Sequence, residues 1–154
     1  AKPISLDEWK PNGCPVNGPA VSARDDQVAV AWFTAKEDTP TVQLALSSDS
    51  GDSFSEPIVV ASPETNGRVG AAILNAGAVA VSWIDITEVH AKIMLSLFSP
   101  QGRLLHTSVV AKTSSSRRSG FPIIESVGDS VFVTWTDVGE TPQVKVARLE
   151  FELN

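Results

Sequence analysis

The sequence predicts an all-β fold, a β-propeller built of four-stranded antiparallel blades, with three blades in this chain. The prediction depends on an apolar motif that ends in tryptophan and recurs at intervals of 51 and 52 residues. Its copies are Val28–Trp32, Val79–Trp83 and Val131–Trp135. The apolar periodicity is two throughout, with turn residues about every 8 to 12 positions, so no long helix is expected. Four-stranded units at this period are typical of propeller blades, and a β-sandwich is the alternative.

Composition and charge limit the class of function. The 154 residues are 42% hydrophobic, which is a normal share for one folded unit. Twelve basic and 18 acidic residues give a net charge of -6, the wrong sign for a surface that neutralises phosphates. No apolar run approaches the roughly 18 residues of a membrane span. We therefore expect no nucleic-acid partner and no membrane insertion, and the single cysteine, Cys14, excludes an internal disulfide framework.

The first 17 residues precede the repeats and contain one expected strand, Pro3–Leu6, followed by a loop rich in proline and glycine. The first blade spans residues 18–61. Its second strand is apolar on both faces, because Val28, Val30 and Trp32 alternate with Ala29, Ala31 and Phe33. A strand of this kind is expected between stacked sheets. The four strands of the first blade are expected at Gly18–Val21, Val28–Phe33, Val42–Leu46 and Glu56–Val60.

The second and third blades repeat this order over residues 68–111 and 118–154. The second blade has expected strands at Gly70–Leu74, Val79–Ile84, Ala91–Leu95 and Ser108–Val110. The third has three, at Gly120–Ile124, Val131–Trp135 and Val144–Leu149. The third blade therefore lacks a fourth strand of its own, whereas the N-terminus carries a spare one.

The turn after the third strand of the first blade contains Ser47, Asp49, Gly51 and Phe54. The carboxylate can accept hydrogen bonds from its own turn, the glycine allows positive φ, and the phenylalanine packs the loop on the sheet. A calcium site at Asp49 and Asp52 is the less favoured interpretation, because too few oxygen ligands lie at suitable spacing. In the second blade the same turn, Phe98–Gly102, keeps only the glycine.

This turn resembles the Asp-box of sialidases (neuraminidases) and other bacterial neuraminidase repeat (BNR) propellers. The resemblance implies a structural box that lies away from the active site, and a periplasmic or secreted protein. Sialidases resemble one another in using a tyrosine nucleophile, a glutamate that activates it, an aspartic acid and three arginines. This chain has no tyrosine. We therefore expect no catalysis by this chain alone and assign no catalytic residue.

Histidines and the cysteine do not indicate a metal site. His90 and His106 have no second histidine or cysteine at ligand spacing, so a zinc site is not expected. A catalytic pair of Cys14 with a histidine is a minor alternative to a loop thiol. The expectation is a chain without a metal ion or cofactor.

Arginine and aspartate recur together in the second and third repeats. Arg68 and Arg118 each precede the first glycine of a blade by two positions, and Asp85 and Asp137 each follow a motif tryptophan by two. An antiparallel hairpin brings these positions to the same end of a sheet. They are expected either to form an ion pair within each blade or to line an anion-binding ring at the mouth of a central channel. The motif tryptophans are expected in the core, and Trp9 is the candidate for an exposed aromatic ligand contact.

Three blades leave two apolar end faces open. We therefore expect a homodimer that closes a six-bladed ring, with Pro3–Leu6 of each copy added to the third blade of the other. A piece of a longer propeller chain is the competing explanation. The leading function is a non-catalytic module that binds a carbohydrate or another anionic small ligand at the channel mouth. The C-terminal half of a sialidase or related glycoside hydrolase, and a structural or protein-interaction propeller, are the alternatives.

Overall fold

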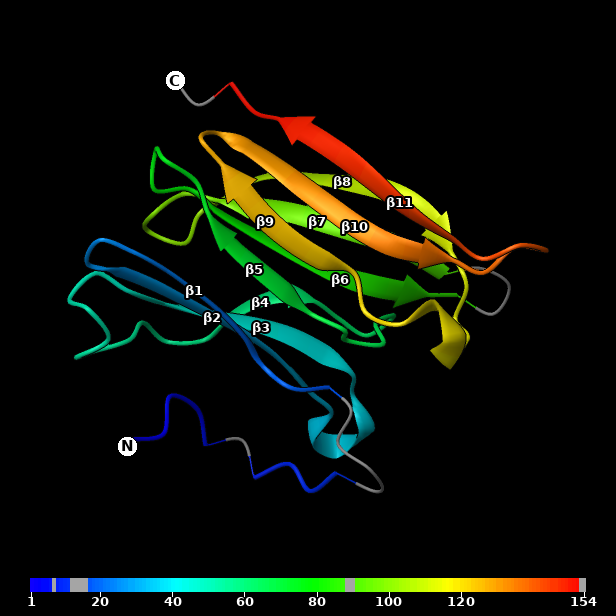
Figure 1. Cartoon of the computed structure of the whole chain (residues 1–154). Coiled ribbons are helices and arrows are strands. Elements are labelled where there is room, and N and C mark those ends of the chain that lie inside the picture. The colour runs from blue at the N-terminus through cyan, green and yellow to red at the C-terminus, as the bar shows by residue number, and fades with distance from the viewer. Residues whose placement is uncertain (7, 12–16, 88–90, 153–154) are drawn as a thin grey trace.

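The computed structural model describes residues 1–6, 8–11, 17–87 and 91–152 (Figure 1). These residues form eleven strands in three antiparallel sheets and two short 3-10 helices, η1 (Lys36–Asp38) and η2 (Arg117–Ser119). The all-β class is confirmed, and the sheets have the propeller-like order expected of the repeats. Within the described part of the chain, no helix has the length and hydrophobicity that a membrane crossing requires.

Each sheet is built from consecutive strands of one repeat. The first sheet contains β1 (Ala20–Arg24), β2 (Gln27–Thr34), β3 (Thr41–Ser47) and β4 (Ile58–Ala61). The second contains β5 (Gly70–Ile73), β6 (Val79–Ile86), β7 (Ala91–Phe98) and β8 (Leu104–Thr113). The third contains β9 (Ile123–Val127), β10 (Ser130–Asp137) and β11 (Gln143–Glu150). The third sheet has no fourth strand among the described residues, as expected.

The sheets stack face to face in chain order, with the second between the other two (Figure 1). Between the first and second sheets, Val79, Val81 and Trp83 pack on a face that includes Ala31 and Leu44. Trp83 is only 3% exposed, which confirms its place in the core. The second motif therefore turns its valine and tryptophan side chains toward the first sheet, and the alanines of the first motif leave room for them.

The junction between the second and third sheets repeats this arrangement. Val131, Val133 and Trp135 pack on a face of the second sheet that includes Leu95 and Leu97. We call the side of each sheet that carries the motif valines and tryptophan its valine–tryptophan face, and the opposite side its leucine face. Each internal junction joins the leucine face of one sheet to the valine–tryptophan face of the next.

The first strands of the three sheets lie side by side along the stack (Figure 1). Ile73 of β5 connects them, because its N–H donates to Ser22 Oγ of β1 at 3.1 Å and its carbonyl accepts from Ser126 Oγ of β9 at 2.7 Å. These serine bridges hold three separate sheets in lateral register. Such convergence of first strands is the propeller-like feature of the fold.

The N-terminal segment differs from the expectation. Pro3–Leu6 is not a strand in this structure. Instead, Ile4 and Trp9 lie with Val30 and Trp32 on the valine–tryptophan face of the first sheet. The segment therefore lies across apolar side chains of this face and does not extend a sheet.

Candidate functional site

The turn that follows β3 has the geometry expected of the Asp-box. Ser53 donates its backbone N–H to Asp49 Oδ1 at 2.8 Å, and Ser47 donates its hydroxyl to the same oxygen at 2.7 Å. The Ser47 oxygen also accepts the N–H of Gly51, whose φ is +87°. Hydrogen bonds from Ser53 and Ser47 lower the pKa of the Asp49 carboxyl to about 2. The carboxylate is therefore saturated within its own hairpin, and its role is structural.

The matching turn in the second sheet uses a serine instead. Ser99 Oγ accepts the N–H groups of Gln101 and Arg103, both at 3.2 Å, and Gly102 supplies the positive φ of +82°. Both turns therefore satisfy exposed backbone donors with a side-chain oxygen. A single hydroxyl serves where the first sheet uses a hydroxyl and a carboxylate.

Arg68 is directed into the chain rather than toward solvent. It is 6% exposed, and its Nη1 donates to the Gly120 carbonyl at 2.8 Å and to Ser119 Oγ at 3.0 Å. The guanidinium also lies 5.6 Å from the ring centroid of Phe121. Its backbone N–H donates to Asn17 at 3.0 Å. Arg68 thus connects the second repeat to the third and to the segment that precedes the first, and these contacts favour a structural role over anion capture.

The partners that the structure shows for Asp85 and Asp137 are not the expected arginines. Asp85 accepts a hydrogen bond from Trp83 Nε1 at 2.6 Å. Burial raises the pKa of the Asp85 carboxyl, opposed by the Trp83 hydrogen bond, and the charges that act on it are those of Glu64 and Lys92. Antiparallel pairing sets Lys92 opposite Asp85 across the hairpin, and the charge of Lys92 acts to lower the pKa of the Asp85 carboxyl.

In the third repeat, too, a lysine is the basic residue beside the aspartate. Asp137 pairs with Lys145, and this hydrogen bond and charge lower the pKa of the Asp137 carboxyl. Lys145 lies opposite Trp135 on β11, so it reaches Asp137 diagonally at the same end of the hairpin. Arg118 has an exposed side chain on η2, and its backbone N–H donates to Ser116. The candidate residues therefore have separate hydrogen-bond partners among the described residues, and the anion-binding ring stays a prediction.

Trp9 is half-buried rather than exposed. Its ring meets that of Phe33 edge to face, with centroids 5.6 Å apart. Together with Trp32, Asn17 and Ser5 they line a pocket of about 360 Å³. Aromatic rings beside an amide and a hydroxyl provide stacking surface and hydrogen-bonding groups in one place.

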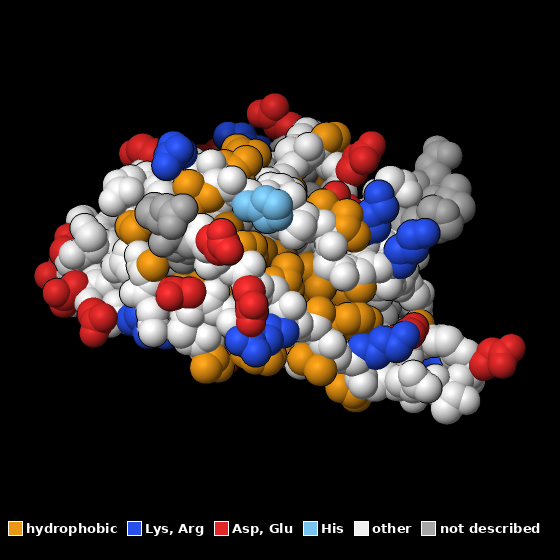
Figure 2. Space-filling model, turned by 90° about the horizontal axis from the view of Figure 1, so that it is seen from above, with side chains coloured by type: hydrophobic (Ala, Val, Ile, Leu, Met, Phe, Trp, Pro, Cys, Tyr) orange, Lys and Arg blue, Asp and Glu red, His pale blue; other side chains and the backbone are white. Residues whose placement is uncertain are grey.

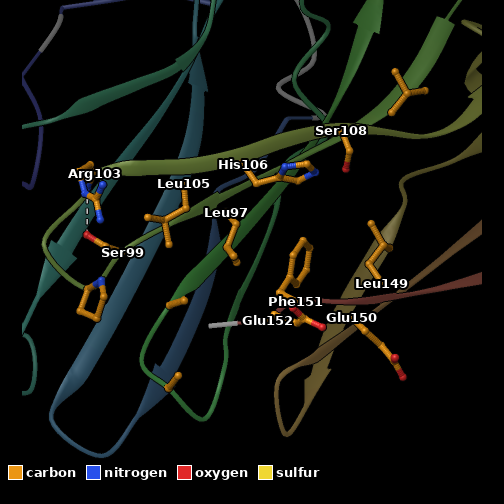
Figure 3. A pocket seen from close by; sticks show the side chains of 14 residues that line it. Leu97, Ser99, Arg103, Leu105, His106, Ser108, Leu149, Glu150, Phe151 and Glu152 are labelled. Atoms are coloured by element: carbon orange, nitrogen blue, oxygen red, sulfur yellow. Dashed lines mark hydrogen bonds between the residues drawn. The ribbon is translucent and has the colours of Figure 1, made fainter. Parts of the chain in front are cut away.

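A feature that the sequence did not predict is a cleft of about 960 Å³ between β8 and β11 (Figure 3). One wall is β8, with Leu105, His106 and Ser108. The other is the end of β11 and the residues after it, from Leu149 to Glu152. Figure 3 shows Phe151 facing His106 across the cleft, and their ring centroids are 6.1 Å apart.

The cleft is apolar inside and charged at its border. Leu97 and Ala78, at its base, are 2% and 3% exposed. Charged residues at the border include Arg103 at the β7–β8 turn and Glu150, which pairs with Arg148 at 2.7 Å. Seen from above, hydrophobic side chains gather in a hollow beside a histidine and are bordered by acidic and basic side chains (Figure 2).

The edge of β11 explains why this cleft exists. β10 is the only strand paired with β11 in the described part of the chain, so the other edge of β11 has no strand partner. In the second sheet, β8 is the fourth strand and lies beside β7. A fourth strand beside β11 would continue the third sheet in the same way and would cover the outer half of the second sheet. The sequence predicted three strands for the third repeat, and the described residues show three. The cleft itself was not predicted, because it depends on how the second and third sheets stack.

No group of three or more histidine, cysteine, aspartate or glutamate side chains that could hold a metal ion occurs among the residues described. Cys14 and His90 lie outside those residues, so their arrangement with His106 is untested. No protein-family model matches this chain, and no curated protein matches its sequence.

Proposed function

We propose that this chain is a non-catalytic binding module that takes an extended polypeptide segment into the cleft between β8 and β11. The segment adds to the free edge of β11 as a fourth strand of the third sheet. The observation that carries the proposal is this edge, which lies beside an apolar cleft of about 960 Å³. Unpaired main-chain groups supply affinity for an added strand, and the adjacent apolar walls select its side chains.

The order of residues in the cleft supports an extended occupant. A strand beside β11 would turn alternate side chains toward Leu105 and His106 of β8 and toward Leu97 beneath them. Ser108 Oγ is buried and has no hydrogen-bond partner among the described residues. A polar group of the occupant can satisfy it.

Binding of a synthetic peptide tests the proposal. The probe is residues 55–62 of this chain, which contain β4, labelled for fluorescence anisotropy. We expect saturable binding, and we expect N-methylation at one alternate set of residues to abolish it, because the methyl groups remove the N–H donors that face β11. Methylation of the other set should be tolerated.

Two adjacent leucines provide matched variants of the chain. Leu105 lines the cleft and is 39% exposed, whereas Leu104 is 55% exposed and does not line it. Leu105→Asp should weaken peptide binding, and Leu104→Asp should leave it unchanged. No binding, or equal binding of both methylated peptides, would show that strand addition is not the function.

We also propose that the chain is a sialidase-like propeller module. The Asp-box turn and the propeller-like order of the sheets support this assignment. Because the chain has no tyrosine nucleophile, we expect no hydrolysis of a fluorogenic sialoside. Turnover that survives repurification would contradict this expectation.

A carbohydrate is the second candidate ligand, and the aromatic pocket of Trp9, Trp32 and Phe33 favours it. Titration with sialyllactose and lactose, followed by tryptophan fluorescence, tests this function. We expect Trp9→Ala to remove binding at this pocket. Loss of binding in Arg118→Ala instead would favour the anion site at a channel mouth.

A further inference from the structure

We propose that the two open end faces of the stack are the two halves of one interface, and that a second copy of this chain docks on them to form a ring of six sheets. In this ring, Pro3–Leu6 of each copy adds to the β11 edge of the other. The inference rests on the proposed function, since it names the segment that β11 takes up.

The leucine face of the third sheet is exposed at positions that are buried elsewhere. Ala31, Ser82 and Thr134 are equivalent residues of the three motifs. Their partners on the next strand are Leu44, Leu95 and Val146. Leu44 and Leu95 are 0% exposed, whereas Val146 is 63% exposed. The third sheet therefore offers an apolar side chain where the other sheets bury one in a junction.

A second position gives the same result. Phe33, Ile84 and Thr136 are also equivalent, and they pair with Val42, Ile93 and Val144. Val42 and Ile93 are fully buried, and Val144 is the most exposed of the three. An exposed pair of valines at two junction positions indicates a face made to be covered.

The first sheet is open on its opposite, valine–tryptophan face. Val30, Val81 and Val133 pair with Val21, Ala71 and Ile124 on the first strands. Ile124 is 8% exposed in its junction, and Ala71 packs against the other junction, but Val21 is 68% exposed. The first sheet thus lacks the neighbour that covers this position in the other two.

The two open faces are of complementary kinds. Each internal junction joins a leucine face to a valine–tryptophan face, and the stack ends in one of each. A two-fold axis between two copies would form this junction twice and leave neither face open. A second copy is therefore the occupant that repeats the contact already made twice within the chain.

The N-terminal segment resembles the fourth strand of the first sheet. Pro3-Ile4 repeats Pro57-Ile58, and Ile58 begins β4 and pairs with Leu44. Because Val146 is the equivalent of Leu44, the same register would place Ile4 opposite Val146 and Ser5 opposite Lys145 in the partner. The occupant of the β11 edge thus has both the sequence and the register of an outer strand.

Docking and strand exchange are coupled. In one copy, Ile4, Ser5 and Trp9 lie with Val30 and Trp32 on the valine–tryptophan face of the first sheet. A partner's third sheet can reach this face only when the segment leaves it. The same movement frees the segment to add to the partner's β11.

Light scattering coupled to size exclusion, over a range of concentrations, tests the ring. We expect a dimer, and we expect Val146→Asp and Val21→Asp each to raise its dissociation constant at least about tenfold, because each buries a charge in both junctions. Leu104→Asp is the matched control. It lies on β8 of the middle sheet, is 55% exposed and should dimerise like the unsubstituted chain.

Mixing the two impaired variants tests the head-to-tail arrangement. A mixed dimer of Val146→Asp with Val21→Asp carries both substitutions in one junction and none in the other. We therefore expect mixing to restore part of the dimer. A monomer at every concentration, a dimer that neither variant weakens, or no recovery on mixing would overturn the proposal, provided that circular dichroism shows folded variants.

Disulfide trapping tests the strand exchange. With Cys14→Ser as background, Ser5→Cys and Lys145→Cys together should give a covalent dimer on oxidation, since opposed residues of neighbouring strands lie within disulfide reach. Ser5→Cys with Lys112→Cys on β8 is the control and should give none. A disulfide within one chain, or none at all, would overturn the exchange.

The outcome separates this inference from the function on which it rests. If the β4 peptide binds at β11 but the chain stays monomeric, the strand-binding function is supported, and a second copy of the chain is not the occupant of this edge. If the peptide does not bind either, both proposals fail.

Discussion

The second and third sheets carry similar residues on their leucine faces, but only one of these faces is covered. Leu95 of β7 is fully buried between sheets, whereas its equivalent Val146 of β11 is 63% exposed. The difference comes from the neighbours, because the third sheet follows the second but no described sheet follows the third. Equivalent positions in a repeat protein therefore contribute to stability only where a neighbouring repeat covers them.

Truncation of these equivalent residues should give the largest contrast. Leu95→Ala leaves a cavity in a fully packed junction and should lower the free energy of unfolding by about 2 to 5 kcal/mol. Val146→Ala should change it by less than about 0.5 kcal/mol in the monomer. Urea unfolding at low protein concentration measures both values. Equal losses would mean that Val146 is already covered in a single copy.

The connection between the second and third sheets can be broken at Arg68. Arg68→Met keeps much of the side-chain volume but leaves the Gly120 carbonyl and Ser119 hydroxyl without this donor. We expect the free energy of unfolding to fall by about 1 to 3 kcal/mol. Arg118→Met, at an exposed side chain on η2, should change the free energy of unfolding by less than about 0.5 kcal/mol. An Arg68→Met chain as stable as the parent would contradict the structural role and favour ligand binding by Arg68 instead.

The first junction can be tested at the β7–β8 turn. Gly102 has a φ of +82°, and a Cβ there would lie 2.4 Å from Ile58 Cδ1. Gly102→Ala should therefore lower the free energy of unfolding by about 1 to 2 kcal/mol, because alanine is strained in a left-handed backbone and forces Ile58 to shift. Gly139→Ala meets open space and should have little effect. Thermal unfolding of the two variants, compared with the parent chain, measures the difference.

The smallest expected effect distinguishes the two turns. Because the folded pKa of Asp49 is about 2, below the ordinary 3.8, its stabilising contribution is present above pH 3.8 and is lost as the pH falls toward 2. The Asp49→Asn variant should therefore be less stable than the parent chain above pH 3.8, and this difference in the free energy of unfolding should shrink as the pH falls toward 2. Denaturant midpoints between pH 2 and 6 measure it. The Ser99 turn lacks a carboxylate, so Ser99→Ala should show no such pH dependence.

Local patterns predicted much of the fold. The recurring motif indicated the three sheets and their order, and the turn of Ser47 and Asp49 formed the expected hydrogen bonds. The ends of strands were less accurate. β8 begins at Leu104 and not at Ser108, because pairing with β7 extends it past polar residues that the alternation did not count.

The candidate site was predicted less well, for a physical reason. Spacing correctly placed Asp85 and Asp137 at the ends of β6 and β10, but it could not identify their partners. Strand register brings Lys92 and Lys145 to them from the neighbouring strands. The backbone at Arg68 has a positive φ of 53°, and its side chain reaches Ser119 and Gly120, just before the third sheet, instead.

Alternation and turn chemistry specify the sheets, because they act between residues close in the chain. Three-dimensional packing sets which faces are buried, where the β8–β11 cleft lies, and that the N-terminal segment covers the first sheet. These features depend on contacts between different repeats, or between the N-terminal segment and a repeat, whose residues are far apart in the sequence. Such contacts follow from how whole sheets stack, and no local pattern encodes them.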